Sequence, residues 1–138
     1  TADYKKIDPM LGDDSDFSAL CESAHKMGIK IIIDCAFSHT GSNSIYFDKK
    51  KIFGNGAYSN ENSPYRDWYS FSEYPEKYTS WWGIDTLPCV NELNPDFMNY
   101  IIFDENSVVA KWLNLGADGF RTNFPTSLSR PLQSASKR

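Results

Sequence analysis

The sequence IIIDCAFSH at residues 31–39 decides the fold. It is too continuously apolar for a half-exposed strand and is rich in β-branched residues, which is typical of a buried parallel strand. The sequence GADGFR at residues 116–121 has the same form. Each stretch ends in a charged or hydrogen-bonding side chain, and a parallel α/β barrel presents its chemistry at these strand ends. We therefore expect an α/β fold with a parallel sheet.

Length, charge and cysteine content narrow the class of protein. The 138 residues suffice for one domain, whereas a complete (β/α)8 barrel usually needs roughly 250. The net charge of −4 argues against a nucleic-acid partner, because no basic stripe is present to neutralise phosphates. No apolar run is long enough to cross a membrane. The three cysteines (Cys21, Cys35 and Cys89) lack metal-ligand spacing and favour a reduced, cytoplasmic protein.

A helix is expected immediately before the first strand. Residues 13–15 offer N-cap oxygens, and the apolar residues that follow recur at helical spacing. Gly28 is a suitable residue to end the helix, which we place at about residues 15–27. The buried strand then covers residues 29–37.

Residues 38–93 show no sustained helical or strand period and are rich in Gly, Asn, Ser, Tyr and Trp. A connection of this length in a compact domain indicates an inserted lobe or an active-site wall. Asn94 and Pro95 then form a helix start. The apolar pattern beyond them predicts two consecutive helices, or one kinked helix, stopped by Gly116. The second strand follows at residues 118–121.

Four motifs occur in order along the chain: DYKKIDP at 3–9, DCAFSH at 34–39, LPCVN at 87–91 and GADGFR at 116–121. Together they resemble consecutive motifs of glycoside hydrolase family 13, the α-amylase family, and most closely its neopullulanase and cyclomaltodextrinase branch. The resemblance covers residues 1–121 without a gap. It implies a (β/α)8 barrel with an inserted domain B after the third strand, of which this chain holds about strands two to four.

The resemblance also implies boundaries within the chain. Residues 1–37 would hold the second strand, second helix and third strand of the barrel. Residues 38–93 would be domain B, and residues 94–121 would hold the third helix and fourth strand. Residues 122–138 contain no Asp or Glu and depart from the family pattern. They are either a disordered basic tail or, as argued below, out-of-frame sequence.

Family members cleave α-glucans by a retaining mechanism, so the resemblance implies roles for several side chains. His39 is similar to the family histidine that hydrogen-bonds the hydroxymethyl group of the sugar being cleaved. Arg121 is similar to the arginine two residues before the nucleophile, and Asp34 to a carboxylate that braces the strand ends. Without a nucleophile, Arg121 would pair with Asp34. The side chains of Tyr78, Trp81 and Trp82 would either stack on sugar or pack domain B.

The spacing from Arg121 places the nucleophile at position 123, which holds Asn123. An amide cannot form the covalent glycosyl intermediate efficiently. The resemblance places the general acid and the third carboxylate of the family on later strands, which this chain does not hold, so we expect no catalytic carboxylate in it. In the resembling branch, Arg is commonly followed by Leu-Asp-Val-Ala-Asp-Glu-Leu-Pro-Asp-Glu. Codons for the last six of these residues, read one base late, translate as Thr-Asn-Phe-Pro-Thr, the sequence at 122–126. The hypothesis is a short deletion that shifted the reading frame.

The sequence therefore predicts a fragment of an intracellular α-glucan hydrolase, inactive as it is given. Its partner would be an α-glucan oligosaccharide such as a maltodextrin, a cyclomaltodextrin or pullulan. The alternative is a non-catalytic, amylase-like glycan-binding or scaffold protein. No metal or other cofactor is expected, because Ser38 replaces the asparagine with which some amylases build a calcium site. The sequence predicts no particular oligomeric state.

Overall fold

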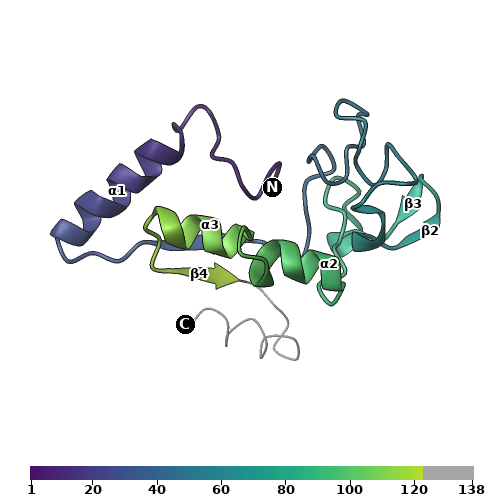
Figure 1. The fold of residues 1–138 in the computed structure, drawn as a ribbon. Coiled ribbons are helices and arrows are strands. Elements are labelled where there is room, and N and C mark those ends of the chain that lie inside the picture. Colours follow the sequence, from purple (N-terminus) through teal and green to yellow (C-terminus); the bar gives the residue numbers. More distant parts are fainter. Residues whose placement is uncertain (123–138) are drawn as a thin grey trace. The chain divides into compact units, whose positions relative to one another are not determined.

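The structure of the chain is a computed structural model that describes residues 1–122 in two compact units (Figure 1). The first unit consists of residues 1–3 and 36–98. The second consists of residues 4–35 and the chain from residue 99 onward. Asn123 and the remainder of the predicted tail lie outside the described residues. Each unit is described by itself.

Helix α1 (Asp14–Lys26) belongs to the second unit and confirms the helix predicted at residues 15–27. Its N-cap is Asp13, whose side chain accepts hydrogen bonds from the backbone N–H of Ser15 and Asp16 in a capping box. Gly28 follows the C-cap with φ +75°, and its N–H donates to the carbonyl of His25. This left-handed turn satisfies the last carbonyls of the helix.

The predicted run of consecutive helices is also confirmed. In the first unit, Asn94 caps the short helix α2 (Pro95–Met98) by accepting from the N–H of Asp96 and Phe97. In the second unit, the π-helical turn η3 (Asn99–Phe103) and helix α3 (Val108–Leu115) follow along the chain. Gly116 ends α3 with φ +119°, as the sequence predicted.

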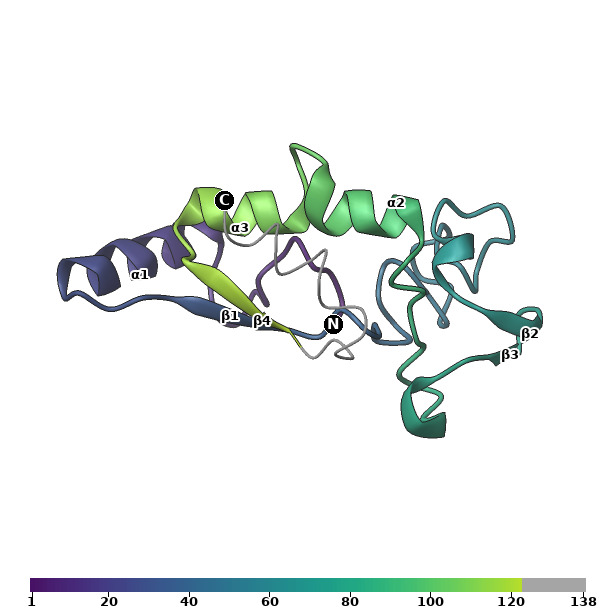
Figure 2. The ribbon, with the colours of Figure 1, turned by 90° about the horizontal axis from the view of Figure 1, so that it is seen from below.

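The two strands decisive for the fold are neighbours in a parallel sheet of the second unit (Figure 2). Strand β1 (Ile32–Cys35) pairs with β4 (Gly119–Thr122), and Asp34 lies opposite Arg121 in the register. The parallel pairing confirms the prediction. The prediction that β1 is fully buried was wrong, because Ile32 is 56% exposed. Within residues 1–122, this sheet has two strands, so β1 has one strand neighbour and its outer side chains are left uncovered.

The core of the second unit lies between α1 and α3, which pack against each other. Cys21 and Ala24 of α1 are buried, as are Val108 and Trp112 of α3. The Phe17 and Trp112 rings meet edge to face at 5.2 Å. The indole N–H of Trp112 donates to the Tyr4 carbonyl at 2.8 Å and so fixes the N-terminal segment of this unit on the helix.

The first unit is built around buried aromatic rings instead of long regular elements. Its hairpin of β2 (Phe71–Glu73) and β3 (Lys77–Tyr78) is short, as are the turns η1 (Arg66–Trp68) and η2 (Trp81–Gly83). The rings that share the core are Tyr46, Phe47, Trp68, Tyr69 and Phe97. Their packing explains why residues 38–93 show no sequence period, since ring contacts do not require side chains at regular spacing.

Candidate functional site

Asp34 and Arg121 form an ion pair across β1 and β4 of the second unit. The guanidinium Nη1 of Arg121 donates to Oδ2 of Asp34 at 2.5 Å, and the parallel register places the two residues side by side. Both side chains are exposed. The pairing expected in the absence of a nucleophile is therefore present, while the substrate-binding role of Arg121 stays a prediction. An exposed pair of this kind contributes at most about 1 kcal/mol to stability.

His39 lies in the first unit, where it forms an antiparallel bridge with Cys89. Its Nδ1 lies 3.1 Å from the Ser38 hydroxyl. Partial burial lowers the pKa of the imidazole below its ordinary value, so the ring is neutral at pH 7. A neutral imidazole has one donor and one acceptor nitrogen. This suits a sugar hydroxyl, because a hydroxyl group can also donate and accept a hydrogen bond.

The rings of His39, Trp81 and Trp82 are neighbours in that order and form a series. The rings of His39 and Trp81 lie 5.5 Å apart at 35°, and those of Trp81 and Trp82 lie 5.2 Å apart at 28°. Exposure rises along the series, since Trp81 is 38% exposed and Trp82 is 85% exposed. Trp82 also has a left-handed backbone, with φ +54° and ψ +27°. For a bulky residue this conformation is an outlier, of the kind that occurs at ligand-binding positions.

Tyr78 lies in a different environment from the two tryptophans. Its ring packs 4.7 Å from Phe47 and 6.0 Å from Phe71, in the aromatic core of the first unit. Its hydroxyl donates to the carbonyl of Asp85 at 2.6 Å and accepts from Lys49 Nζ at 3.0 Å. These contacts correspond to the packing alternative of the sequence analysis.

The structure thus brings together Asp34 with Arg121 in one unit, and His39 with Trp81 and Trp82 in the other. The sequence reasoning missed Lys49 and Asp85, which form an ion pair at 3.3 Å and lie 36 residues apart in the chain. No local pattern signals such a distant pair. It also missed Ser38 as a partner of His39, although a hydroxyl beside a histidine is a readable signal.

Asp118 was quoted only as part of a motif, yet it joins three segments of the second unit. Its Oδ2 accepts from the Ile31 N–H at 2.8 Å and lies 2.7 Å from Nε2 of His25. Lys30 Nζ lies 3.6 Å from Oδ1. The N–H of Ile31 is the largest cause that holds the Asp118 pKa below its ordinary value, and the His25 contact is the second. This carboxylate therefore holds the start of β1 next to the start of β4.

Neither a metal site nor a membrane segment is found in the part of the chain that the structure describes. Up to Thr122, no group of three or more His, Cys, Asp or Glu side chains could hold a metal ion. Among the same residues, no helix is long and apolar enough to span a bilayer.

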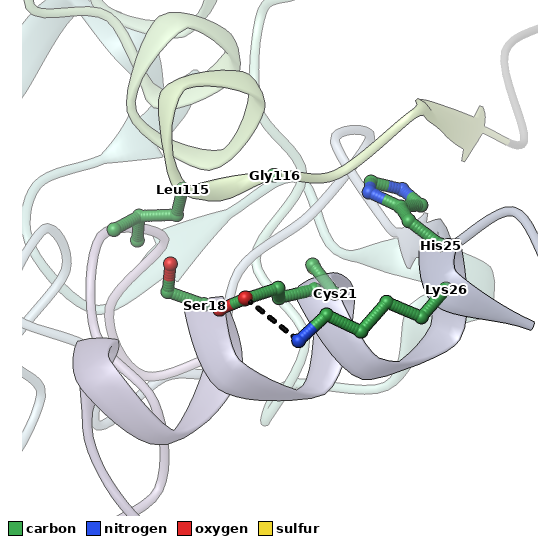
Figure 3. Close-up of a pocket in the computed structure, with 7 residues that line it drawn as sticks. Ser18, Cys21, His25, Lys26, Leu115 and Gly116 are labelled. Atoms are coloured by element: carbon green, nitrogen blue, oxygen red, sulfur yellow. Dashed lines mark ion pairs between the residues drawn. The ribbon is translucent and has the colours of Figure 1, made fainter.

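A pocket of about 550 Å³ lies on the second unit, between α1 and the end of α3 (Figure 3). Lys26 and Glu22 form an ion pair at 3.1 Å beside it. It is lined by Ser18, Cys21, Glu22, His25, Lys26, Leu115 and Gly116. No residue that the sequence predicts to bind sugar lines this pocket.

Comparison with known proteins relates the chain to α-glucan hydrolases. The family model described as alpha amylase, catalytic domain, matches residues 1–135. The amylopullulanase of Thermoanaerobacterium thermosulfurigenes is 44% identical over 148 residues, which cover 94% of this chain and 8% of that protein. Neopullulanase 2 of Thermoactinomyces vulgaris is 35% identical over 128 residues, covering 88% of this chain and 20% of that protein.

Solved structures agree with these relatives. The ligand-free cyclic α-maltosyl-(1→6)-maltose hydrolase of Arthrobacter globiformis superposes with a TM-score of 0.82 at 26% identity, covering 99% of this chain and 31% of that one. The type III pullulan hydrolase of Thermococcus kodakarensis gives a TM-score of 0.75 at 27% identity, covering 99% of this chain and 24% of that one. The chain spans only a minor part of each of these proteins. Together with the matched motifs, these likenesses show that the chain belongs to the α-amylase family, in its neopullulanase-like branch.

Proposed function

We propose that the chain is the part of an α-glucan hydrolase that carries barrel strands two to four and, at residues 38–93, domain B. Membership of the α-amylase family supports this proposal. The similarity to an amylopullulanase and to a neopullulanase supports it as well. The substrate class is an α-glucan oligosaccharide such as a maltodextrin, a cyclomaltodextrin or a segment of pullulan. The odd number of cysteines supports a cytoplasmic location.

The observation that carries the proposal is the ring series of His39, Trp81 and Trp82. A glucose ring has apolar C–H faces and a rim of hydroxyl groups, so it requires both a flat apolar partner and a hydrogen-bonding group. The exposed indole of Trp82 supplies the flat partner, and the neutral imidazole of His39 supplies the hydrogen-bonding group. Trp81 lies between them, 5.5 Å from His39 and 5.2 Å from Trp82.

In the retaining mechanism of this family, one carboxylate attacks the anomeric carbon while a second protonates the leaving group. Arg121 would orient the attacking carboxylate and hold its pKa down. The position two residues later holds Asn123, whose amide lacks the nucleophilic oxygen. We therefore expect this chain to bind α-glucan without cleaving it. Incubation with pullulan should release no reducing sugar, and release above the blank would contradict the expectation.

The reading-frame hypothesis is tested at the level of DNA. The family match extends to residue 135, so it includes the segment in which the shift is proposed. Resequencing the gene tests the frame shift. A deletion after the Arg121 codon supports it, and an intact reading frame that encodes Asn123 disproves it.

Sugar binding is tested by titrating the chain with maltoheptaose and following tryptophan fluorescence. An aromatic contact is worth about 0.5–1.5 kcal/mol, so Trp82→Ala should weaken binding by about 2–13-fold. Phe53→Ala is a matched control, because Phe53 is an exposed aromatic residue of the same unit that is 54% accessible. Absence of saturable binding by the unmodified chain would disprove the proposed function. Equal affinities of Trp82→Ala and Phe53→Ala would disprove the assignment of Trp82.

A further inference from the structure

We propose that Lys49 and Tyr78 are positioning residues that hold residues 81–87, here called the Trp loop, in the conformation that presents Trp82 to the glucan. The inference rests on the proposed function and adds to it two residues that do not touch the sugar. All the contacts that carry it lie within the first unit.

The Trp loop is closed at its neck by its own backbone. The N–H of Trp81 donates to the carbonyl of Leu87 at 2.8 Å, and the N–H of Leu87 donates to that of Ile84 at 2.9 Å. The flanking residues Ser80 and Pro88 form an antiparallel bridge. Within the loop, the N–H of Gly83 donates to the Ser80 carbonyl at 3.3 Å and that of Ile84 to the Trp81 carbonyl at 3.0 Å, while the Thr86 carbonyl accepts from the Ser42 N–H at 2.9 Å. These bonds shape the loop backbone, but most of its side chains, including that of Asp85 at its tip, are exposed.

Lys49 and Tyr78 fasten this tip through Asp85. The Tyr78 hydroxyl donates to the Asp85 carbonyl at 2.6 Å, and Lys49 Nζ donates to the Asp85 carboxylate at 3.3 Å. Lys49 Nζ also donates to the Tyr78 hydroxyl at 3.0 Å, which closes a ring of three interactions. The backbone and the side chain of Asp85 are thus held at the same time.

Both holding residues are themselves well anchored. The ring of Tyr78 packs in the aromatic core, 4.7 Å from Phe47. The N–H of Lys49 donates to the carbonyl of Ser42 at 2.8 Å. The preceding residue, Asp48, is buried, and its carboxylate accepts from the N–H groups of residues 52–54. The contact with the Tyr78 hydroxyl raises the Lys49 pKa, so the ammonium stays charged across the neutral range.

The Trp loop needs such support because its conformation is costly. A left-handed backbone costs a residue with a side chain about 1–2 kcal/mol, and Trp82 has φ +54°. Trp82 is 85% exposed, so few contacts of its own offset this cost. If the loop relaxes, only a fraction of the molecules presents the indole correctly, and the apparent affinity falls by that fraction.

Three variants separate positioning from packing. Tyr78→Phe removes the hydroxyl and retains the ring, and Lys49→Met removes the ammonium and retains the apolar stem. Lys50→Met is the control, since Lys50 is the exposed neighbour of Lys49 and has no hydrogen bond or ion pair among the described residues. For each variant, amide hydrogen exchange at Ile84 and Leu87 reports on the Trp loop, and maltoheptaose titration reports on binding.

We expect Lys49→Met and Tyr78→Phe to speed exchange at these two amides by about 5–10-fold and to weaken glucan binding by the same factor. Lys50→Met should change neither quantity. Unchanged exchange in Lys49→Met would overturn the inference, as would faster exchange with unchanged affinity. Absence of glucan binding by the unmodified chain would instead disprove the proposed function, and the inference with it.

Discussion

Substitution of Gly116 by alanine tests the contact between the two helices of the second unit. Gly116 ends α3 with φ +119° and leads into β4, the strand that carries Arg121. A Cβ at this position would lie 2.7 Å from Cβ of Cys21 on α1, which real Cβ atoms do not approach. Cys21 is buried and lies in the middle of its helix, so the clash can be relieved only by movement of the helices.

The destabilisation has two parts, and a second glycine isolates one of them. A left-handed alanine costs about 1–2 kcal/mol, and overpacking a core costs about 1–3 kcal/mol more. We therefore expect Gly116→Ala to lower the free energy of unfolding by about 2–5 kcal/mol. Gly28 also has a left-handed backbone, with φ +75°, but no atom lies within 4 Å of an added Cβ. Gly28→Ala should incur only the backbone cost, about 1–2 kcal/mol.

Urea unfolding followed by circular dichroism measures both free energies. The slope of the transition should be the same for the two variants, and only the midpoint should move. The double variant Cys21→Gly/Gly116→Ala removes the opposing Cβ, so its destabilisation should be smaller than the sum of the two single effects. Equal losses for Gly116→Ala and Gly28→Ala would refute the reasoning, since they would show that the helices part without cost.

Two further predictions concern titratable groups of the second unit. The Asp118 pKa is held low, so its contribution to stability should be complete above the unfolded value of about 3.9 and be lost as the pH falls through the lower folded value. The urea midpoint should fall over that range in the native chain and less in Asp118→Asn, and parallel pH profiles would contradict this. Burial, with a smaller effect of Asp34, raises the Cys35 pKa to about 11. Cys35 should therefore react with Ellman's reagent at pH 8 more slowly in the folded chain than in urea, and equal rates would contradict this.

Capping chemistry made the helices of this chain predictable. Asp13 and Gly28 mark the two ends of α1, and both act through bonds to residues at most four positions away. The parallel pairing of β1 and β4 was predictable for a different reason. The order of strand and helix signals leaves few topologies open, and a right-handed crossover between parallel strands is the common one.

The burial of β1 and the details of the first unit could not be predicted in the same way. The apolar composition of β1 predicted cover on both faces, but exposure also depends on how many strands lie alongside, which the composition of one strand does not specify. Residues 38–93 fold through contacts between distant rings and through pairs such as Lys49 with Asp85. These contacts leave no period in the sequence, so Tyr78 could be read equally well as a sugar platform or as a core residue.

The two groups of predicted sugar contacts differ in how firmly their geometry is fixed. Arg121 is held by an exposed ion pair with Asp34, which contributes little free energy and weakens with salt. Its guanidinium can therefore exchange Asp34 for another anion or a sugar hydroxyl at small cost. Trp81 is held by the backbone bonds of the Trp loop, and Trp82 has a backbone conformation that a relaxed loop would abandon. Preorganisation of the rings therefore has to come from the chain itself, so we expect loop anchoring to affect the proposed glucan affinity more directly than the charged pair does.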